Sequence, residues 1–370
     1  MSGKTLITGY SEQLASLICH EILAREKKAR VFLLVRSKKI KAAERLLSKL
    51  PASQAERVSL FEGDVRSLDL GLSGVEYKKL VSQVDRIFHV SRSEDYSLDR
   101  AQLFEINFTG TGNVLALARE CPQLERFVHF SSIYVSGELK GVIDEEEFFH
   151  KPRFRNAVEE SFHAAEKLVR GSMRKLPVTI FRLGTVVGDS KTGEFFSFKG
   201  PYRILQLMLS LERGIPLVFP GKCNGMANLV PVDYVKDAVL HIVELPGSEG
   251  TTYQLTDPYP MTARQVLEAM AAYIGRKPPR FGLPTMLFGT VLKIPRLAKL
   301  SGIPRELLDY FNQKAIHNTS RTLSDLKGAG ISCPRFESYF PLNLEYARQR
   351  IKQRRDLREE QELVDPLDWS

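Results

Sequence analysis

Short runs of β-branched and apolar residues alternate with longer segments in which apolar residues recur every three or four positions. The apolar runs predict strands at residues 4–8, 30–35, 58–61, 86–90, 126–130, 178–182 and 252–255. The periodic segments predict helices between the strands, the longest at 99–119 and 156–174. Continuous apolar strands separated by helices are typical of a parallel sheet covered on both faces. The sequence therefore predicts an α/β fold with a doubly wound parallel sheet.

The regular alternation ends after residue 182, and the next segment is rich in glycine and proline. A strand and a helix follow within 228–256, and the remainder is proline-rich with short helical patterns. We expect a Rossmann-type domain formed by 1–182 and 228–256, and a smaller C-terminal substrate lobe formed by 183–227 and 257–345. Residues 346–370 carry mixed charge with few apolar anchors and are expected to form a charged tail.

Composition excludes several classes of protein. The 370 residues are 43% hydrophobic and 26% charged, as in an ordinary globular protein. The net charge of +9 comes from scattered basic residues, which indicates attraction to anions rather than a nucleic-acid site. Four separated cysteines, with no signal peptide and no apolar run of ~18 residues, favour a cytoplasmic protein without a transmembrane segment. No spacing of His, Cys, Asp or Glu suggests a metal site.

The first strand, turn and helix follow the pattern of a dinucleotide-binding βαβ unit, with one departure. The strand at 4–8 leads through Gly9 into an amphipathic helix, and the second strand follows at 30–35. A turn that binds pyrophosphate keeps several glycines, so that the backbone can approach the phosphates. In a TGxxGxxG pattern the next two glycine positions hold Glu12 and Ala15. The Glu12 carboxylate can repel phosphate, cap the helix N-terminus, or do both.

Seven motifs in a fixed order resemble those of the extended short-chain dehydrogenase/reductase family. They include Leu6-Ile-Thr-Gly9, Phe61-Glu-Gly-Asp64-Val65, Arg86-Ile-Phe-His89-Val90, Asn107-Phe-Thr-Gly-Thr-Gly, the segment ending Ser131-Ser132-Ile-Tyr, and Phe181-Arg-Leu-Gly184. Two further motifs, Gly188-Asp-Ser-Lys-Thr-Gly193 and Ile331-Ser-Cys-Pro334, are similar to those of thioester reductases and fatty acyl-CoA reductases, the male sterility-type branch. The resemblance spans residues 4–340.

The resemblance implies a catalytic Ser or Thr and a YxxxK pair. In the family, a nearby cation and the cofactor lower the pKa of the tyrosine, which then exchanges a proton with the substrate while hydride moves. Ser132 matches the hydroxyl residue, but Val158 holds the tyrosine position and Phe162 the lysine position. With Ala165 and Val169 these two side chains form an apolar seam along one helix face. We expect the former catalytic edge to pack as core.

The resemblance also implies that any cofactor is NADP(H). Arg36 ends the second strand, where a basic residue favours a 2′-phosphate over a bare ribose; an exposed basic loop is the alternative. The remaining cofactor-contacting positions carried over from the family are Thr8, Gly9, Asp64, Val65, His89 and Asn107. Because Glu12 and Ala15 replace glycines, we expect cofactor binding to be weak or lost.

Two functions stay open. The first is a catalytically degenerate family member, a pseudoenzyme that acts as a binding or regulatory module with an apolar, acyl-type cleft. The alternative is an active NADP(H)-dependent oxidoreductase that reduces an acyl-thioester, aldehyde or related carbonyl, with Ser132 and ordered water replacing the tyrosine. The expected partner is a small, acyl or lipid-like molecule. Residues 283–293, followed by Arg296, Lys299 and Arg305, could contact a membrane surface or an acyl chain, or pack as a cap helix.

Overall fold

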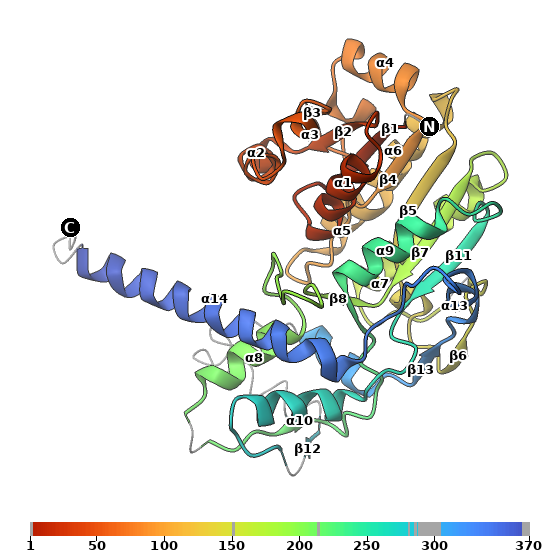
Figure 1. Ribbon diagram of the computed structural model, residues 1–370. Helices are drawn as coiled ribbons and strands as arrows, with labels where there is room; N and C mark the ends of the chain where they lie inside the picture. Colours follow the sequence, from red (N-terminus) through yellow and green to blue (C-terminus); the bar gives the residue numbers. More distant parts are fainter. Residues whose placement is uncertain are drawn as a thin grey trace. The chain divides into compact units, whose positions relative to one another are not determined.

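A computed structural model describes residues 3–149, 152–212, 215–279, 282–284, 287 and 305–364, without the side chains of 305–306 and 354–364. The described chain divides into two compact units, one formed by 1–186, 232–258 and 314–333, the other by 187–231, 259–313 and 334–370. Most of the expected acyl-binding or membrane-surface segment, 283–293 with Arg296 and Lys299, lies outside the described residues. Figure 1 shows the elements of both units in their chain order.

The first unit contains most of the elements. They are β1 (Lys4–Thr8), α1 (Gln13–Arg25), β2 (Arg30–Val35), η1 (Ser37–Lys39), α2 (Ile40–Leu47), α3 (Ala52–Ala55), β3 (Val58–Glu62), η2 (Leu68–Gly71), α4 (Gly74–Gln83), β4 (Arg86–His89), α5 (Arg100–Phe104), η3 (Glu105–Thr109), α6 (Gly110–Glu120), β5 (Arg126–Ser132), η4 (Ile133–Ser136), β6 (Gly141–Ile143), α7 (Ala157–Ser172), β7 (Val178–Leu183), α9 (Val232–Ile242), β11 (Thr251–Leu255), β13 (Ala315–His317) and α13 (Ser320–Asp325). Strand β8 (Thr185–Val187) lies where the chain leaves this unit.

The second unit contains α8 (Pro201–Ser210), β9 (Phe219–Pro220), β10 (Leu229–Pro231), α10 (Ala263–Tyr273), β12 (Gly282–Leu283), η5 (Arg305–Asn312) and α14 (Phe336–Val364). Its core is rich in aromatic rings, and Phe195 stacks on Tyr202 with 3.8 Å between ring centroids. The Tyr202 hydroxyl accepts a hydrogen bond from the backbone N–H of Gly188 and donates one to Asn343 of α14. These bonds satisfy the Tyr202 hydroxyl within a largely apolar cluster.

The first unit is built on a seven-stranded parallel sheet with the order β11-β7-β5-β4-β1-β2-β3. All of its strands were expected from the apolar runs, and the doubly wound α/β fold is confirmed. The strand order reverses direction between β1 and β4, because the chain first adds strands on one side of β1 and then continues on the other. At such a switch point the loops after the strands diverge, and ligands of doubly wound sheets bind there. In register, Thr8 lies beside His89 and His89 beside His129 at this end of the sheet.

The long helix expected at 99–119 is interrupted. Its N-terminus is closed by an Asp99 capping box, but residues Glu105–Thr109 form a π-helical turn, labelled η3, between α5 and α6. The turn places the Asn107 side chain against Ser93 and Ser161, as described below. A π-turn is rare and occurs frequently at functional sites, and no apolar periodicity identifies one in advance.

Two short strands outside the main sheet were not expected. Strand β6 pairs in parallel with β13, 174 residues later in the chain, with Val142 opposite Ile316. The buried Glu145 carboxylate accepts hydrogen bonds from Thr322 and from the backbone N–H groups of Gln254 and Arg321. These contacts place residues 314–333 in the same unit as the sheet. Sequence analysis assigns them instead to the C-terminal lobe, because their partner strand is far away along the chain.

Candidate functional site

The turn after β1 keeps the geometry of a tight strand-to-helix connection. Gly9 has a φ of +77°, and a Cβ atom there would lie 2.9 Å from the backbone nitrogen of Ser91, so only glycine fits without strain. Glu12 is the N-cap residue of α1; its side chain is exposed and makes no capping hydrogen bond. Ala15 is fully buried, which suits the close packing of α1 on the sheet. An exposed carboxylate therefore stands at the helix N-terminus, where a phosphate would approach.

Three of the expected cofactor residues belong to one buried hydrogen-bonded chain. The Thr8 hydroxyl lies 2.9 Å from Nδ1 of His89, and Nε2 of His89 lies 3.0 Å from the Thr111 hydroxyl. The Thr111 hydroxyl donates to the backbone carbonyl of Asn107. The Asn107 amide bonds both backbone groups of Ser93 and the Ser161 hydroxyl of α7. Thr8, His89 and Asn107 are thus brought together. Most of their polar atoms, however, already make hydrogen bonds within the protein that connect β1, β4, η3 and α7.

The histidines at this end of the sheet are neutral. Burial, with the neighbouring His129, lowers the pKa of His89 to about 3. Burial also lowers the pKa of His129 to about 4, although the Glu166 charge opposes the shift. The two rings stack with 5.8 Å between centroids. Nδ1 of His129 is buried without a hydrogen-bond partner among the described residues, so this residue is held by packing.

Three further residues of the predicted cofactor set lie at or just after the ends of β2 and β3. Arg36 is exposed at the end of β2, which is compatible both with binding of a 2′-phosphate and with an exposed basic loop. Asp64 forms a bidentate ion pair with Arg66, with Nη2 2.7 Å from Oδ2. Burial raises the pKa of Asp64, but the Arg66 hydrogen bonds outweigh it and the net pKa is lowered. Val65 is buried against Gly110, where a Cβ would lie 2.9 Å from its methyl group.

Ser132 ends β5 and is buried. Its hydroxyl accepts a hydrogen bond from the backbone N–H of Tyr134, in the first turn of the short helix η4. The Tyr134 hydroxyl lies 3.3 Å from that of Thr185. Burial raises the pKa of Tyr134, so the phenol stays protonated at neutral pH. Ser132 is therefore retained at the position the family pattern gives it, with its oxygen occupied as a cap.

Val158 and Phe162 are both buried on α7, each 4% exposed. They form an apolar cluster with Leu103 of α5 and Val135 of η4. Neither side chain carries a group that could exchange a proton. The helix face that would present a Tyr-Lys pair is thus a packed apolar face.

A cation lies on this face that sequence analysis missed. Arg92 follows β4, its guanidinium lies over the Phe162 ring at 5.4 Å from the centroid, and Nη1 donates to the backbone carbonyl of Ser131 at 2.7 Å. Its Nη2 lies 2.8 Å from the Glu94 carboxylate. A basic residue just after the strand at 86–90 was the available signal, but nothing in the sequence places it against residue 162.

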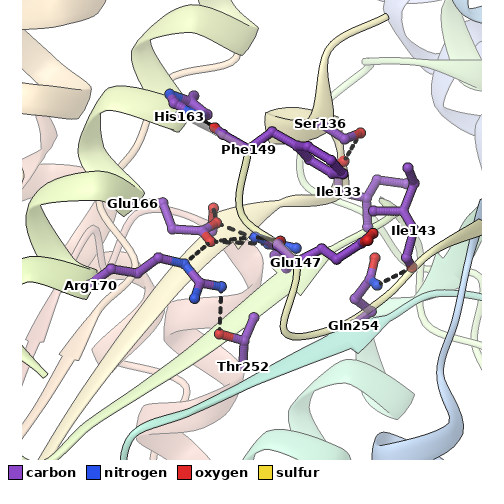
Figure 2. A network of polar contacts seen from close by, with 12 residues as sticks. Ile133, Ser136, Ile143, Glu147, Phe149, His163, Glu166, Arg170, Thr252 and Gln254 are labelled. Atoms are coloured by element: carbon purple, nitrogen blue, oxygen red, sulfur yellow. Dashed lines mark hydrogen bonds and ion pairs between the residues drawn. The ribbon is translucent and has the colours of Figure 1, made fainter. Parts of the chain in front are cut away.

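Glu166, one helical turn after Phe162 on α7, carries a buried charged network. Glu166 is fully buried and accepts hydrogen bonds from Arg182, Arg170 and the Ser131 hydroxyl, the last at 2.6 Å. Figure 2 shows Arg170 reaching on to Thr252 of β11, 2.8 Å away. Burial raises the pKa of a carboxyl, but Arg182 above all, with Arg170 and Ser131, holds the pKa of Glu166 at about 2. The network joins α7 to β5, β7 and β11 and so fixes the helix beside Ser132.

The described residues show neither a metal site nor a membrane-spanning helix. Among the described residues, no group of three or more His, Cys, Asp or Glu side chains is placed to hold a metal ion. Within the same residues, no helix has both the length and the apolar character that crossing a bilayer requires.

Comparison with known proteins gives consistent matches. Residues 7–239 match the family model of the male sterility protein. The chain is 26% identical over 217 residues to glycine betaine reductase ATRR of Emericella nidulans, covering 58% of this chain and 17% of that protein. It is 23% identical over 274 residues to fatty acyl-CoA reductase wat of Drosophila melanogaster, covering 63% of this chain and 52% of the relative. The chain thus spans about a sixth to a half of these relatives.

A solved structure is similar over nearly the whole chain. The terminal R domain of the myxalamid PKS-NRPS biosynthetic pathway superposes with a TM-score of 0.80 at 27% sequence identity, covering 94% of this chain and 91% of that one. The fold of this chain is therefore similar to that of this R domain over nearly its whole length.

Proposed function

This chain belongs to the male sterility family of NAD(P)-dependent reductases, and we propose that it is a catalytically degenerate member of that family. In this proposal it acts as a binding or regulatory module and does not turn over a substrate. The observation that carries the proposal is the burial of Val158 and Phe162 in an apolar cluster, at the positions of the family's tyrosine and lysine.

Without the family's tyrosine and lysine, proton transfer to the substrate and positioning of the cofactor are both affected. Reduction of a carbonyl or thioester needs hydride and a proton in the same small space, and the acid normally contributes roughly 10²–10⁴-fold to the rate. The phenol at this strand end, Tyr134, lies beside Thr185, and burial raises its pKa, so that it stays protonated at neutral pH. Loss of the lysine also removes the group that would position the nicotinamide ribose, so the two losses act on one reaction.

The residues at the β1 turn do not fit the pyrophosphate of a dinucleotide. Glu12 places a carboxylate at the N-terminus of α1, and repulsion between it and a phosphate amounts to about 1–4 kcal/mol at 4 Å in partly screened surroundings. Its Cβ also prevents the close backbone approach that glycine allows. We therefore propose that dinucleotide binding is weak or lost, with any residual preference for NADP(H) supplied by the exposed Arg36.

The ligand that we propose for such a module is a small molecule with an acyl or otherwise apolar part. The apolar cluster around Phe162 supports this, because it replaces polar groups at the strand end with hydrocarbon. The four cysteines are all free thiols, which supports the cytoplasm as the compartment.

An active reductase is the second candidate. It is favoured by the retention of Ser132 at the end of β5 and by the presence of one cation, Arg92, over the lysine position. In that case the Ser132 hydroxyl and ordered water would deliver the proton in place of the tyrosine.

Steady-state NADPH oxidation distinguishes the two candidates. Purified protein is assayed with acyl-CoA, acyl-thioester and aldehyde substrates, with Ser132→Ala as the matched variant and an active reductase of the same family as the positive control for the assay. We expect no turnover above the rate without protein. Turnover that is present in the natural chain and absent in Ser132→Ala would establish the active reductase and end the proposal of degeneracy.

A further inference from the structure

Arg92 occupies the end of the sheet at which ligands of doubly wound folds bind. It follows β4, one of the two strands at the switch point, and its neighbour Ser91 lies directly against the Gly9 turn of β1. Its hydrogen bond to the Ser131 carbonyl holds the guanidinium at the end of β5. The side chain is 17% exposed, so most of its length is enclosed by protein while one edge meets solvent.

The Phe162 ring gives Arg92 an apolar platform. The guanidinium lies 5.4 Å from the centroid of this ring, within the range of a cation–π interaction. Phe162 stands at the position where the family carries lysine, so a positive charge is restored close to that position from a different element. The charge is supplied by a planar group with five N–H donors, which suits a carboxylate or phosphate better than an ammonium does.

The only anion that Arg92 contacts among the described residues is Glu94. Glu94 Oε1 lies 2.8 Å from Nη2, and the Glu94 side chain is 42% exposed. An ion pair with one partner in solvent contributes little to stability, so Glu94 can leave at small cost. Nη1 is already bonded to Ser131, which fixes the guanidinium whether or not Glu94 is present.

We propose that Arg92 is the anion-binding residue of this strand end, and that a ligand oxyanion, carboxylate or phosphate, takes the place that Glu94 holds. Glu94 then acts as an internal competitor that any ligand displaces. The inference deepens the proposed function, because it names the charged group that a ligand of this module must carry.

Calorimetric titration of the full chain at low ionic strength tests the proposal. The probes are inorganic phosphate, octanoate and NADPH, each titrated into the natural chain, Glu94→Gln, Arg92→Met and Arg92→Lys. For the probe that binds, we expect Glu94→Gln to lower the dissociation constant about threefold or more and Arg92→Met to raise it about tenfold or more. Arg92→Lys should give an intermediate value, because it keeps the charge without the planar donors. The probe that responds identifies the source of the oxyanion.

Arg100 supplies a matched control. It lies over the ring of Phe104 at 4.3 Å and pairs with Glu160, but it is exposed and away from the strand end. Arg100→Met should leave every dissociation constant unchanged. The proposal is overturned if Arg92→Met binds as the natural chain does, or if no probe binds to Glu94→Gln. If Arg92→Met does not fold, Arg92→Lys and Glu94→Gln carry the same test. NADPH turnover in the separate assay would refute degeneracy and leave this result standing.

Discussion

Single side chains at the end of the sheet redistribute charge relative to a working reductase. The negative charge of Glu12 stands at the N-terminus of α1, where the helix dipole favours an anion. The positive charge of Arg92 stands over Phe162, where the family pattern has a lysine. A phosphate that approaches from the β1 turn therefore meets repulsion first, and an oxyanion at the β5 end meets attraction. This polarity is opposite to the one that suits a dinucleotide pyrophosphate.

The first prediction at this scale concerns Glu12. We expect Glu12→Gly to strengthen NADPH binding about tenfold, because it removes the carboxylate and lets the backbone approach the phosphates. Glu12→Gln keeps the Cβ and removes only the charge. The difference in NADPH affinity between the two variants therefore gives the steric effect of the side chain, apart from its charge. Calorimetry or thermal-shift titration with NADPH gives the affinities. Equal affinity in the natural chain and both variants would mean that the carboxylate was never the obstacle.

Helix α7 is held in place by contacts on two adjoining parts of its surface. Its N-terminus is capped by Asn156, Val158 and Phe162 pack against α5 and η4, and Glu166, one turn after Phe162, enters the charged network of Figure 2. Breaking a buried ion pair by removing one partner costs about 3–5 kcal/mol, so Glu166 and Arg182 strongly fix the helix. Burial of Val158 and Phe162 stabilises the position of the helix further. The position of the helix thus does not depend on a tyrosine or a lysine.

The prediction for this element concerns Phe162→Lys, which restores the family residue. The new ammonium would be buried in the apolar cluster and close to the Arg92 guanidinium, so we expect a loss of at least about 3 kcal/mol in the free energy of unfolding. Phe162→Met is the control for lost volume and should cost roughly 1–2 kcal/mol. Urea denaturation provides both values.

Repeating Phe162→Lys in an Arg92→Met background completes a double-mutant cycle. Because the like charge is then absent, we expect Phe162→Lys to cost about 1 kcal/mol less in that background. Strictly additive costs would show that the two positions do not interact.

At the scale of the whole molecule, the parts determined by local pattern could be predicted and those determined by long-range pairing could not. Most strands of the main sheet are short runs dominated by apolar and β-branched residues, which burial on both faces of a parallel sheet favours. The resemblance to the extended short-chain dehydrogenase/reductase family and its thioester reductase-like branch is confirmed by the family match. The pairing of β6 with β13 and the π-turn η3 depend on distant partners and left no periodic signal.

The same distinction applies to the site. Ser132, Val158 and Phe162 could be assigned to catalytic positions because each lies at a fixed spacing within a motif, and these assignments stay predictions. Arg92 and the partners of Glu166 could not, because their roles arise only when the ends of different strands come together. The sequence also could not show that Thr8 and His89, both predicted as cofactor contacts, lie within one buried chain of hydrogen bonds.

The last prediction concerns acid stability, which depends on several buried groups at once. The pKa of His89 and of His317 is lowered to about 3 and that of His129 to about 4, chiefly by burial. The unfolded chain binds protons near pH 6.5, whereas the folded chain resists them, so this stability is present above pH 6.5 and is lost as pH falls towards 4 and 3. Glu166, with its pKa at about 2, adds a second loss below pH 4.5.

For His129 alone, a folded pKa of about 4 corresponds to a loss of roughly 2 kcal/mol in the free energy of unfolding between pH 7 and pH 5. His129→Phe keeps an aromatic ring in the strand and removes both the titration and the unsatisfied Nδ1. Urea midpoints at pH 7, 6 and 5 should therefore fall more gently for His129→Phe than for the natural chain. His241→Phe makes the same substitution on helix α9 and serves as the control for replacing a histidine with phenylalanine. Parallel pH profiles for the natural chain and His129→Phe would show that His129 accepts its proton without unfolding the sheet.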